Sequence, residues 1–300
     1  MLITLINGEL NIQYIDRYIF ILLILMIPFN SLADAGSCDI FEVIDCDKNV
    51  VSPKEKKGKW ILGVGLAHAH GVPDYIGSDE SRNLTLPLPY ILYNGPKMKI
   101  SSSGINRKLF HHDKLFVSLS LSGAIPVDSD KNQARKGMDD IDAVFEYGPS
   151  FKYFLQGNNK ADSALFIDLN FREARTLKLD SLNFSSSPSV VFRKKLQQDY
   201  FMGQVSMSST FKFEFVSDKY AQAFYGVDEA FETATRESYK AEGGYAGIRF
   251  NSSLRWQRDN QIVSLFFAYS DISAAKYVSS PLVKVTSHTL FGGSYFWLFD

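Results

Sequence analysis

The chain has 300 residues, a formal net charge of -1, 45% hydrophobic residues and 14% aromatic residues. The balanced charge argues against a nucleic-acid-binding protein, which usually carries a basic face. The mean hydropathy of -0.09 argues against a bundle of apolar membrane helices. The 24 Phe and 15 Tyr suit a soluble domain or a membrane barrel, which carries outward Phe and interfacial Tyr and Trp.

Residues 1–35 are predicted to form a cleaved secretory signal. Arg17 precedes the apolar run Ile19–Phe29, which is shorter than the roughly 20 residues that a membrane-spanning helix needs. Small residues follow, so we expect cleavage after Ala35, with Ala33 as the alternative. A membrane anchor is the competing interpretation, and Pro28 argues against it. The segment before the basic residue is long for a leader, which leaves the start codon open.

Residues 36–59 are predicted to be a polar periplasmic lead-in. The only cysteines of the chain, Cys38 and Cys46, lie in it. In an oxidising compartment they would form a disulfide or remain two unpaired thiols, and the sequence is compatible with both. The basic run Lys54–Lys59 indicates a solubilising face, with contact to an anionic surface as the alternative.

Beyond this lead-in, apolar residues alternate with small or polar residues. In the stretch from Lys114 to Ala124, leucine and valine fall on one face and serine on the other. Period-two spacing sends the two sets to opposite sides of a strand. A soluble sandwich would turn the apolar face inward, whereas a membrane barrel turns it toward lipid. The same alternation recurs at residues 60–67, 165–172, 201–215, 263–269 and 291–299.

These segments are about ten residues long, which is typical of tilted transmembrane strands rather than of soluble strands of about 5–6 residues. Residues 60–300 are therefore predicted to form an all-β, antiparallel transmembrane β-barrel. We expect about 12 strands, with about 10 as the alternative, because an even number returns both termini to the periplasm. Closure also removes the unpaired edges of an open sheet.

Turn-forming residues interrupt the predicted strands at Asn94–Pro96, Gly157–Asn159 and Arg258–Asn260. Longer polar stretches occur at Asp128–Asp140 and Ser217–Ser238, and both are predicted to be loops. The second stretch is rich in alanine, which indicates a short helical piece.

The chain ends in alternating aromatic residues from Tyr295 to Phe299, followed by Asp300. Such a final strand is the expected signal for the machinery that assembles outer-membrane barrels, although the usual pattern ends on the aromatic residue. We expect this strand to close the barrel against the strand that begins near Trp60.

Several ordered motifs resemble those of the MltA-interacting protein family, also called MipA/OmpV. They are Gly63–Leu66, Val72–Asp79, Leu86–Tyr90, Glu146–Pro149, Phe224–Val227, Tyr239–Gly244 and Ser279–Val283. The motifs run from about Trp60 to Phe299, so the resemblance covers nearly the whole mature chain.

The resemblance implies a barrel in the cell outer membrane of a Gram-negative bacterium, in contact with lipid and lipopolysaccharide. Some members are described as scaffolds that bring a murein hydrolase and a murein synthase together. Others are described as porin-like or immunogenic surface proteins. The family has no established catalytic motif, so no catalytic residue carries over. Three functions stay open. An envelope scaffold is the first, a small pore or uptake channel the second, and a membrane-embedded hydrolase the least favoured. The oligomeric state is open too.

We expect no enzyme activity and no catalytic, cofactor-binding or metal-binding residue. A Ser-His-acid site needs three groups brought together, and no G-x-S-x-G motif is present. His68 and His70 share one face of a predicted strand, so a metal site is the weaker alternative there. His111 and His112 would point to opposite sides of an extended chain. The segment Pro73–Asp79 is interpreted as a tight turn, with a recognition loop as the alternative.

Seven charged residues fall at or near strand positions opposite the apolar faces, and we expect them to line the barrel interior. They would form either a narrow channel or a packed, salt-bridged interior. The residues are Asp168, Arg172, Arg193, Lys212, Glu214, Arg249 and Arg255.

Overall fold

The computed structural model describes residues 58–95, 98–101, 104–107, 110–112, 114–158, 161–200 and 203–299. The predicted signal peptide, nearly all of the predicted lead-in, both cysteines and Asp300 lie outside these residues.

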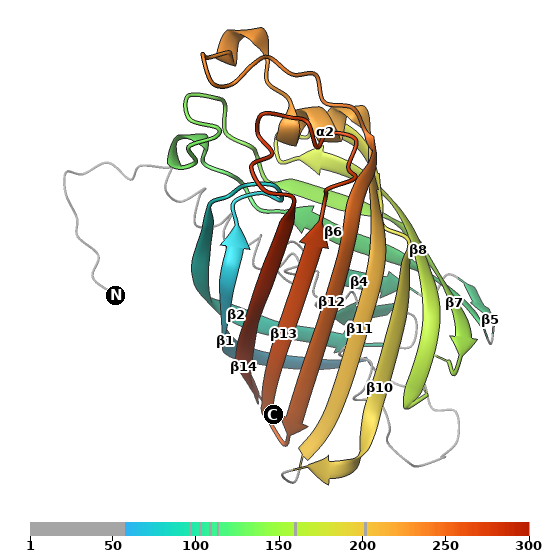
Figure 1. The fold of residues 1–300 in the computed structure, drawn as a ribbon. Helices are drawn as coiled ribbons and strands as arrows, with labels where there is room; N and C mark the ends of the chain where they lie inside the picture. The colour runs from blue at the N-terminus through green and yellow to red at the C-terminus, as the bar shows by residue number, and fades with distance from the viewer. Residues whose placement is uncertain are drawn as a thin grey trace, which may run out of the picture.

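The described chain is almost entirely β-structure (Figure 1). The strands are β1 (Lys59–Pro73), β2 (Ser81–Asn94), β3 (Met98–Ser101), β4 (Gly104–Arg107), β5 (Phe110–His112), β6 (Leu115–Ala124), β7 (Val144–Gln156), β8 (Ser163–Thr176), β9 (Ser181–Ser186), β10 (Ser189–Tyr200), β11 (Gly203–Val216), β12 (Gly244–Arg258), β13 (Gln261–Asp271) and β14 (Ser287–Phe299). The helical elements are α2 (Asp218–Tyr225) and two 3-10 turns, η2 (Ser129–Lys131) and η3 (Glu229–Phe231). Among the described residues, no helix has both the length and the apolar character to cross a bilayer.

All fourteen strands belong to one antiparallel sheet. β9 and β10 keep the same register against β8 and β11, and Pro188, which has no N–H to donate, lies at the break between them. β4 and β5 also run in one direction, because β4 is antiparallel to β3 and β5 to β6. With each of these pairs counted once, the fourteen elements occupy twelve positions around the described sheet, and at one of them β3 has only four residues. This agrees with the expected strand number.

The sheet closes on itself. Its hydrogen-bonded order begins at β4 and ends at β5, which follow each other in the chain, and β4 also lies against β6. The first and last strands pair directly from Leu62 opposite Phe299 to His70 opposite Phe291. The predicted pairing of the closing strand with the strand that begins near Trp60 is therefore confirmed.

The outer face of the sheet is apolar and the inner face is polar, which is the reverse of the arrangement in a soluble protein. Leu265 is 58% exposed on the outer face, whereas Asp168 is 4% exposed inside the barrel. In β6, Leu119 points outward and Ser118 is buried, as the alternation predicts. A closed sheet with an apolar exterior and a polar interior is a transmembrane β-barrel. Further exposed apolar side chains on the outer face are Trp60, Leu62, Val64, Leu66, Phe151, Leu169, Phe171, Val190, Phe213, Phe250, Leu254, Phe267, Phe291, Tyr295, Trp297 and Phe299.

Gly148 in β7 stands where the backbone of β8 comes closest. A Cβ at this position would overlap the carbonyl oxygen of Phe171 and lie 2.8 Å from the Cα of Arg172. We expect Gly148→Ala to lower barrel stability by about 1–3 kcal/mol, because the two strands must move apart. The measurement is the temperature at which the folded band is lost in heat-modifiable gel migration. Gly293→Ala is the control, since its Cβ would meet atoms at 3.3 Å, and equal losses in both variants would contradict the argument.

Candidate functional site

The long connections gather at the end of the barrel opposite the chain's C-terminus (Figure 1). We call residues 74–80, 125–143, 217–243 and 272–286 together the cap. At the other end, β12 and β13 are joined only by Asp259 and Asn260. The two polar stretches predicted to be loops are confirmed, and each forms part of the cap.

Helix α2 confirms the predicted short helix and forms part of the cap. Ser217 caps its N-terminus, accepting a hydrogen bond from the backbone N–H of Tyr220 at 3.3 Å. Asp218 in its first turn accepts the N–H of Gly243 at 2.7 Å. The helix buries Ala221, Phe224 and Tyr225 toward the barrel mouth, so it acts as a lid over the interior.

The segment Pro73–Asp79 makes the tight turn between β1 and β2, and Gly77 adopts a φ of +107° there. The turn also holds the cap together. Tyr75 donates its hydroxyl to the carbonyl of Leu282 at 2.7 Å, and the hydroxyl of Tyr225 donates to the carbonyl of Ile76 at 2.8 Å. The turn is thus hydrogen-bonded to two other connections of the cap, residues 217–243 and 272–286.

Arg135 crosses the cap from the β6–β7 connection and is only 3% exposed. Its guanidinium donates to Ser129 Oγ and to the carbonyls of Phe224 and Asp139, each at 3.1 Å. It also lies over the ring of Tyr75, 6.0 Å from the centroid. Burial lowers the pKa of Arg135, but an arginine remains a cation in proteins, so these contacts are charge-assisted.

Arg236 has a matching role in the β11–β12 connection. It donates to the carbonyls of Ala134 and Lys136 in the neighbouring connection at 3.0 and 3.1 Å, and to that of Phe231. Neither arginine was distinguished by sequence reasoning, because a basic residue in a polar loop looks like an ordinary solvated residue.

Four of the motifs that resemble the MltA-interacting family meet in the cap. Val227 and Tyr239 form an antiparallel bridge, and the Tyr239 hydroxyl lies 3.1 Å from Ser279 Oγ. Ser280 Oγ donates to the carbonyl of Tyr225 at 2.6 Å. The motifs are therefore explained by mutual contact at one end of the barrel, which their separation in the sequence conceals.

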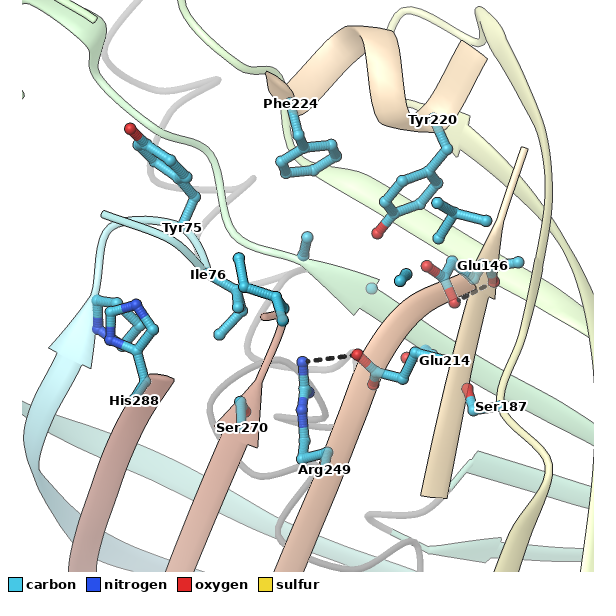
Figure 2. Close-up of a pocket in the computed structure, with 18 of the residues that line it drawn as sticks. Tyr75, Ile76, Glu146, Ser187, Glu214, Tyr220, Phe224, Arg249, Ser270 and His288 are labelled. Atoms are coloured by element: carbon cyan, nitrogen blue, oxygen red, sulfur yellow. Dashed lines mark hydrogen bonds and ion pairs between the residues drawn. The ribbon is translucent and has the colours of Figure 1, made fainter. Parts of the chain in front are cut away.

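A cavity of about 190 Å³ lies between the cap and the upper barrel wall (Figure 2). Tyr220 and Phe224 descend into it from α2, and Ile76 and His288 lie across from them. The lower wall is polar and comes from β7, β8, β11, β12 and β13. Its side chains include Glu146, Arg172, Glu214, Arg249, Asn251 and Ser270.

The charges of this wall are paired. Arg172 Nη1 lies 3.6 Å from Glu146 Oε2, which also accepts the hydroxyl of Ser185 at 2.8 Å. Arg249 Nη2 lies 3.3 Å from Glu214 Oε2, the pair joined by a dashed line in Figure 2. The cavity thus combines an aromatic roof with a wall of two acid-base pairs.

The seven charged residues expected inside the barrel do point inward. Five are nearly inaccessible, and Glu214 and Arg249 are partly buried beside the cavity. Deeper in the barrel, Ser150 donates to Asp168 Oδ1 at 2.6 Å. The five buried residues are Asp168, Arg172, Arg193, Lys212 and Arg255.

Apolar groups occupy the lumen side toward the opposite end. One cluster consists of Phe116, Phe154, Ala164, Phe166 and Val191. A second consists of Tyr90, Leu92, Ile262 and Leu298. The described interior therefore has apolar clusters on the lumen side toward the short turns, charged groups in the middle and the cap at the other end.

The three histidines whose side chains the structure describes, His68, His70 and His288, do not form a site together. His68 Nδ1 lies 2.7 Å from Thr85 Oγ1, and His70 packs on the ring of Phe291, both on the outer face. His288 lines the cavity and accepts the N–H of Gly77 at 3.0 Å. In the part of the chain that the structure describes, no three His, Cys, Asp or Glu side chains are grouped to hold a metal. The side chains of His111 and His112 lie outside the description.

The cap is expected to loosen in strong alkali. Burial raises the pKa of Tyr75, Tyr225 and Tyr277 above the ordinary value of 10.0. An acid whose pKa is raised on folding stabilises the fold fully below its unfolded pKa and loses that contribution as the pH rises toward the folded pKa. Proteolysis of residues 217–243 should therefore stay slow up to pH 10 and accelerate above it. A cap that loosens well below this pH would contradict the burial of these hydroxyls.

Comparison with known proteins places this sequence in a family. The sequence profile described as "MltA-interacting protein MipA" matches residues 62–299. No curated protein matches. Among solved structures, the chain is similar to a "Bacterial polysaccharide outer membrane secretin", at 6% identity and a TM-score of 0.40, over 80% of this chain and 99% of that chain. The profile spans the barrel from β1 to β14, and the chain therefore belongs to the MltA-interacting protein MipA family.

Proposed function

We propose that this protein is a non-enzymatic scaffold of the bacterial outer membrane that brings a murein hydrolase and a murein synthase together. Membership of the MltA-interacting family supports the choice of partners. The observation that carries the proposal is the cap. It is tied across the barrel mouth by buried polar contacts such as those of Tyr75 and Arg135, which argues against an open pore and so favours a scaffold.

The two ends of the barrel suggest where partners dock. Bacterial barrels place short turns in the periplasm and long loops outside, with both termini on the periplasmic side. By this rule the cap faces outward, and the Asp259–Asn260 turn and the C-terminal end of β14 face the periplasm. Murein enzymes work on the periplasmic side, so we assign docking to the short turns together with the predicted lead-in, residues 36–59.

The test is co-purification. The full chain, extracted in detergent and immobilised, should retain a purified murein hydrolase and a purified murein synthase at the same time. An unrelated outer-membrane barrel in the same detergent is the control. Retention of neither enzyme, or equal retention on the control barrel, would reject the scaffold.

The charged lumen favours a small pore as the second candidate. Inward cations outnumber inward acids among the described residues. The cations are Lys152, Arg172, Arg193, Lys195, Lys212, Arg249 and Arg255, and the acids are Glu146, Asp168 and Glu214. Such a lumen would favour anions over cations. Single-channel conductance in planar bilayers with anion selectivity, in a protein that retains no murein enzyme, would support the pore and reject the scaffold.

A further inference from the structure

Among the histidines whose side chains the structure describes, only His288 turns toward the cavity under the cap (Figure 2). It is the second residue of β14. The outward residues on either side of it, Ser287 and Thr289, are polar, and Phe291 is the first outward aromatic residue of the strand. His288 therefore lies at the barrel mouth, outside the part of β14 that spans the membrane.

The imidazole of His288 makes a hydrogen bond that is possible only for its neutral form. Its Nε2 accepts the backbone N–H of Gly77 in the β1–β2 turn at 3.0 Å. A backbone N–H is a donor only, so Nε2 must keep its lone pair, and the neutral ring carries its proton on Nδ1. Protonation of Nε2 would place two donors opposite each other. The bond is therefore lost when His288 becomes a cation.

Gly77 connects this bond to the rest of the cap. Its carbonyl accepts the backbone N–H groups of Lys284 and Val285 at 2.7 and 3.1 Å. The carbonyl of the residue before it accepts the hydroxyl of Tyr225 at 2.8 Å. Displacing Gly77 from His288 therefore disturbs the contacts of the turn with two other connections of the cap.

The surroundings of His288 oppose its cationic form. Burial, and then the positive charge of Arg249 on β12, lower the pKa of His288 from its ordinary value of 6.5. The carboxylates on the neighbouring elements have other partners or lie in solvent, and the two lysines of residues 272–286 are exposed. Glu214 of β11 is paired with Arg249, Glu146 of β7 with Arg172 of β8, Asp74 with Arg82, and Glu80 with the N–H of Gln133, whereas Asp79, Lys276 and Lys284 are exposed.

We propose that the cap is an acid-sensitive lid, closed while His288 is neutral and loosened when His288 takes up a proton. The closed cap binds the neutral imidazole, so this stabilisation is complete above the ordinary pKa of the side chain and is lost as the pH falls below it. One proton changes the opening equilibrium at most tenfold per pH unit. Opening should therefore rise severalfold, and at most about 25-fold, between about pH 7 and about pH 5.

The lid is independent of the scaffold function, because the proposed docking surface lies at the other end of the barrel. The experiment is limited digestion of the full chain, folded in detergent, with a broad-specificity protease at the two pH values. Mass spectrometry locates the cuts, which we expect within residues 217–243 and 272–286. Each variant is compared with the wild-type protein at the same pH, so the pH dependence of the protease cancels. The heat-modifiable gel shift reports the barrel and should not change.

Two variants of His288 remove the titrating group. In His288→Gln the amide oxygen can still accept the N–H of Gly77, so this cap should resist digestion equally well at both pH values. The ratio of the wild-type cleavage rate to that of the variant should therefore rise severalfold in acid. His288→Leu removes the acceptor as well, so its cap should be loosened by the same factor at both pH values. Because neither variant has the acid response, the leucine variant replaces the glutamine variant if the latter does not fold.

His70→Gln is the matched control. The ring of His70 packs on Phe291 on the outer face and does not line the cavity. This variant removes a histidine near the same end of the barrel without touching the turn. It should keep the full acid response of the wild-type protein.

Four outcomes would overturn the proposal. The first is a wild-type cap that is cleaved no faster in acid relative to His288→Gln. The second is an acid response that both His288 variants retain, which would assign the response to the carboxylates of the cap. The third is an acid response that His70→Gln abolishes. The fourth is loss of the barrel gel shift together with the cap in acid. Since none of these outcomes involves murein enzymes, they are distinguishable from failure of the scaffold.

Discussion

Replacing Arg135 with methionine is expected to release the cap while leaving the barrel folded. The variant removes a buried cation that donates to Ser129 and to the carbonyls of Phe224 and Asp139. Each buried acceptor left without a donor costs roughly 1–3 kcal/mol. The total is smaller than the sum over the three acceptors, because water reaches some of them once the arginine is gone. We therefore expect about 3 kcal/mol less stability for the closed cap, which is roughly a hundredfold increase in its opening.

Limited digestion with a broad-specificity protease measures this opening. Cleavage within residues 125–143 and 217–243 should accelerate, while the heat-modifiable gel shift that reports the barrel stays near its original temperature. Lys131→Met is the control on the same connection. Its ion pair with Asp128 is 2.6 Å long but exposed, and exposed pairs contribute little. Equal digestion of the two variants, or loss of the barrel together with the cap, would show that Arg135 does not specifically hold the cap closed.

The walls of the barrel follow from local sequence. A period of two in β6, β8 and β11 determines which side chains face out, and this pattern needs only neighbouring residues to be recognised. The approximate strand number also follows from the count of alternating segments, although the short elements β3, β4 and β5 do not have the expected length. The break at Pro188, which separates β9 from β10, was not predicted. It is recognised only from strand pairing, since β9 and β10 keep one common register against β8 and β11.

The cap could be located from sequence but not assembled. Its connections are visible as polar stretches, yet the hydrogen bonds that hold it together join residues as distant in the sequence as Tyr75 and Leu282. Such contacts have no periodicity, and one hydroxyl or guanidinium among many gives no local signal. The resemblance to the family identified several cap motifs without showing that they meet.

The apolar outer face leads to a second prediction, which distinguishes a membrane barrel from a soluble protein. Leu265 lies in the middle of β13, is 58% exposed and pairs across the sheet with Leu254 and Gly293. Leu179 is 65% exposed at the tip of the β8–β9 hairpin, outside the strands. A soluble protein would accept arginine at either position, because surface substitutions usually change stability by less than about 0.5 kcal/mol.

In a membrane barrel the two positions differ sharply. Arginine near the bilayer midplane on the lipid face costs about 2–4 kcal/mol, whereas arginine on a loop stays in water. Leu265→Arg should therefore lower the free energy of unfolding by this amount for protein folded into lipid vesicles and unfolded with urea, and Leu179→Arg should leave it nearly unchanged. The difference should shrink in a detergent micelle, whose apolar layer deforms around the charge more easily than a bilayer does. Equal effects in vesicles would mean that the exposed leucine of β13 faces water, and the membrane-spanning assignment of the strands would then be wrong.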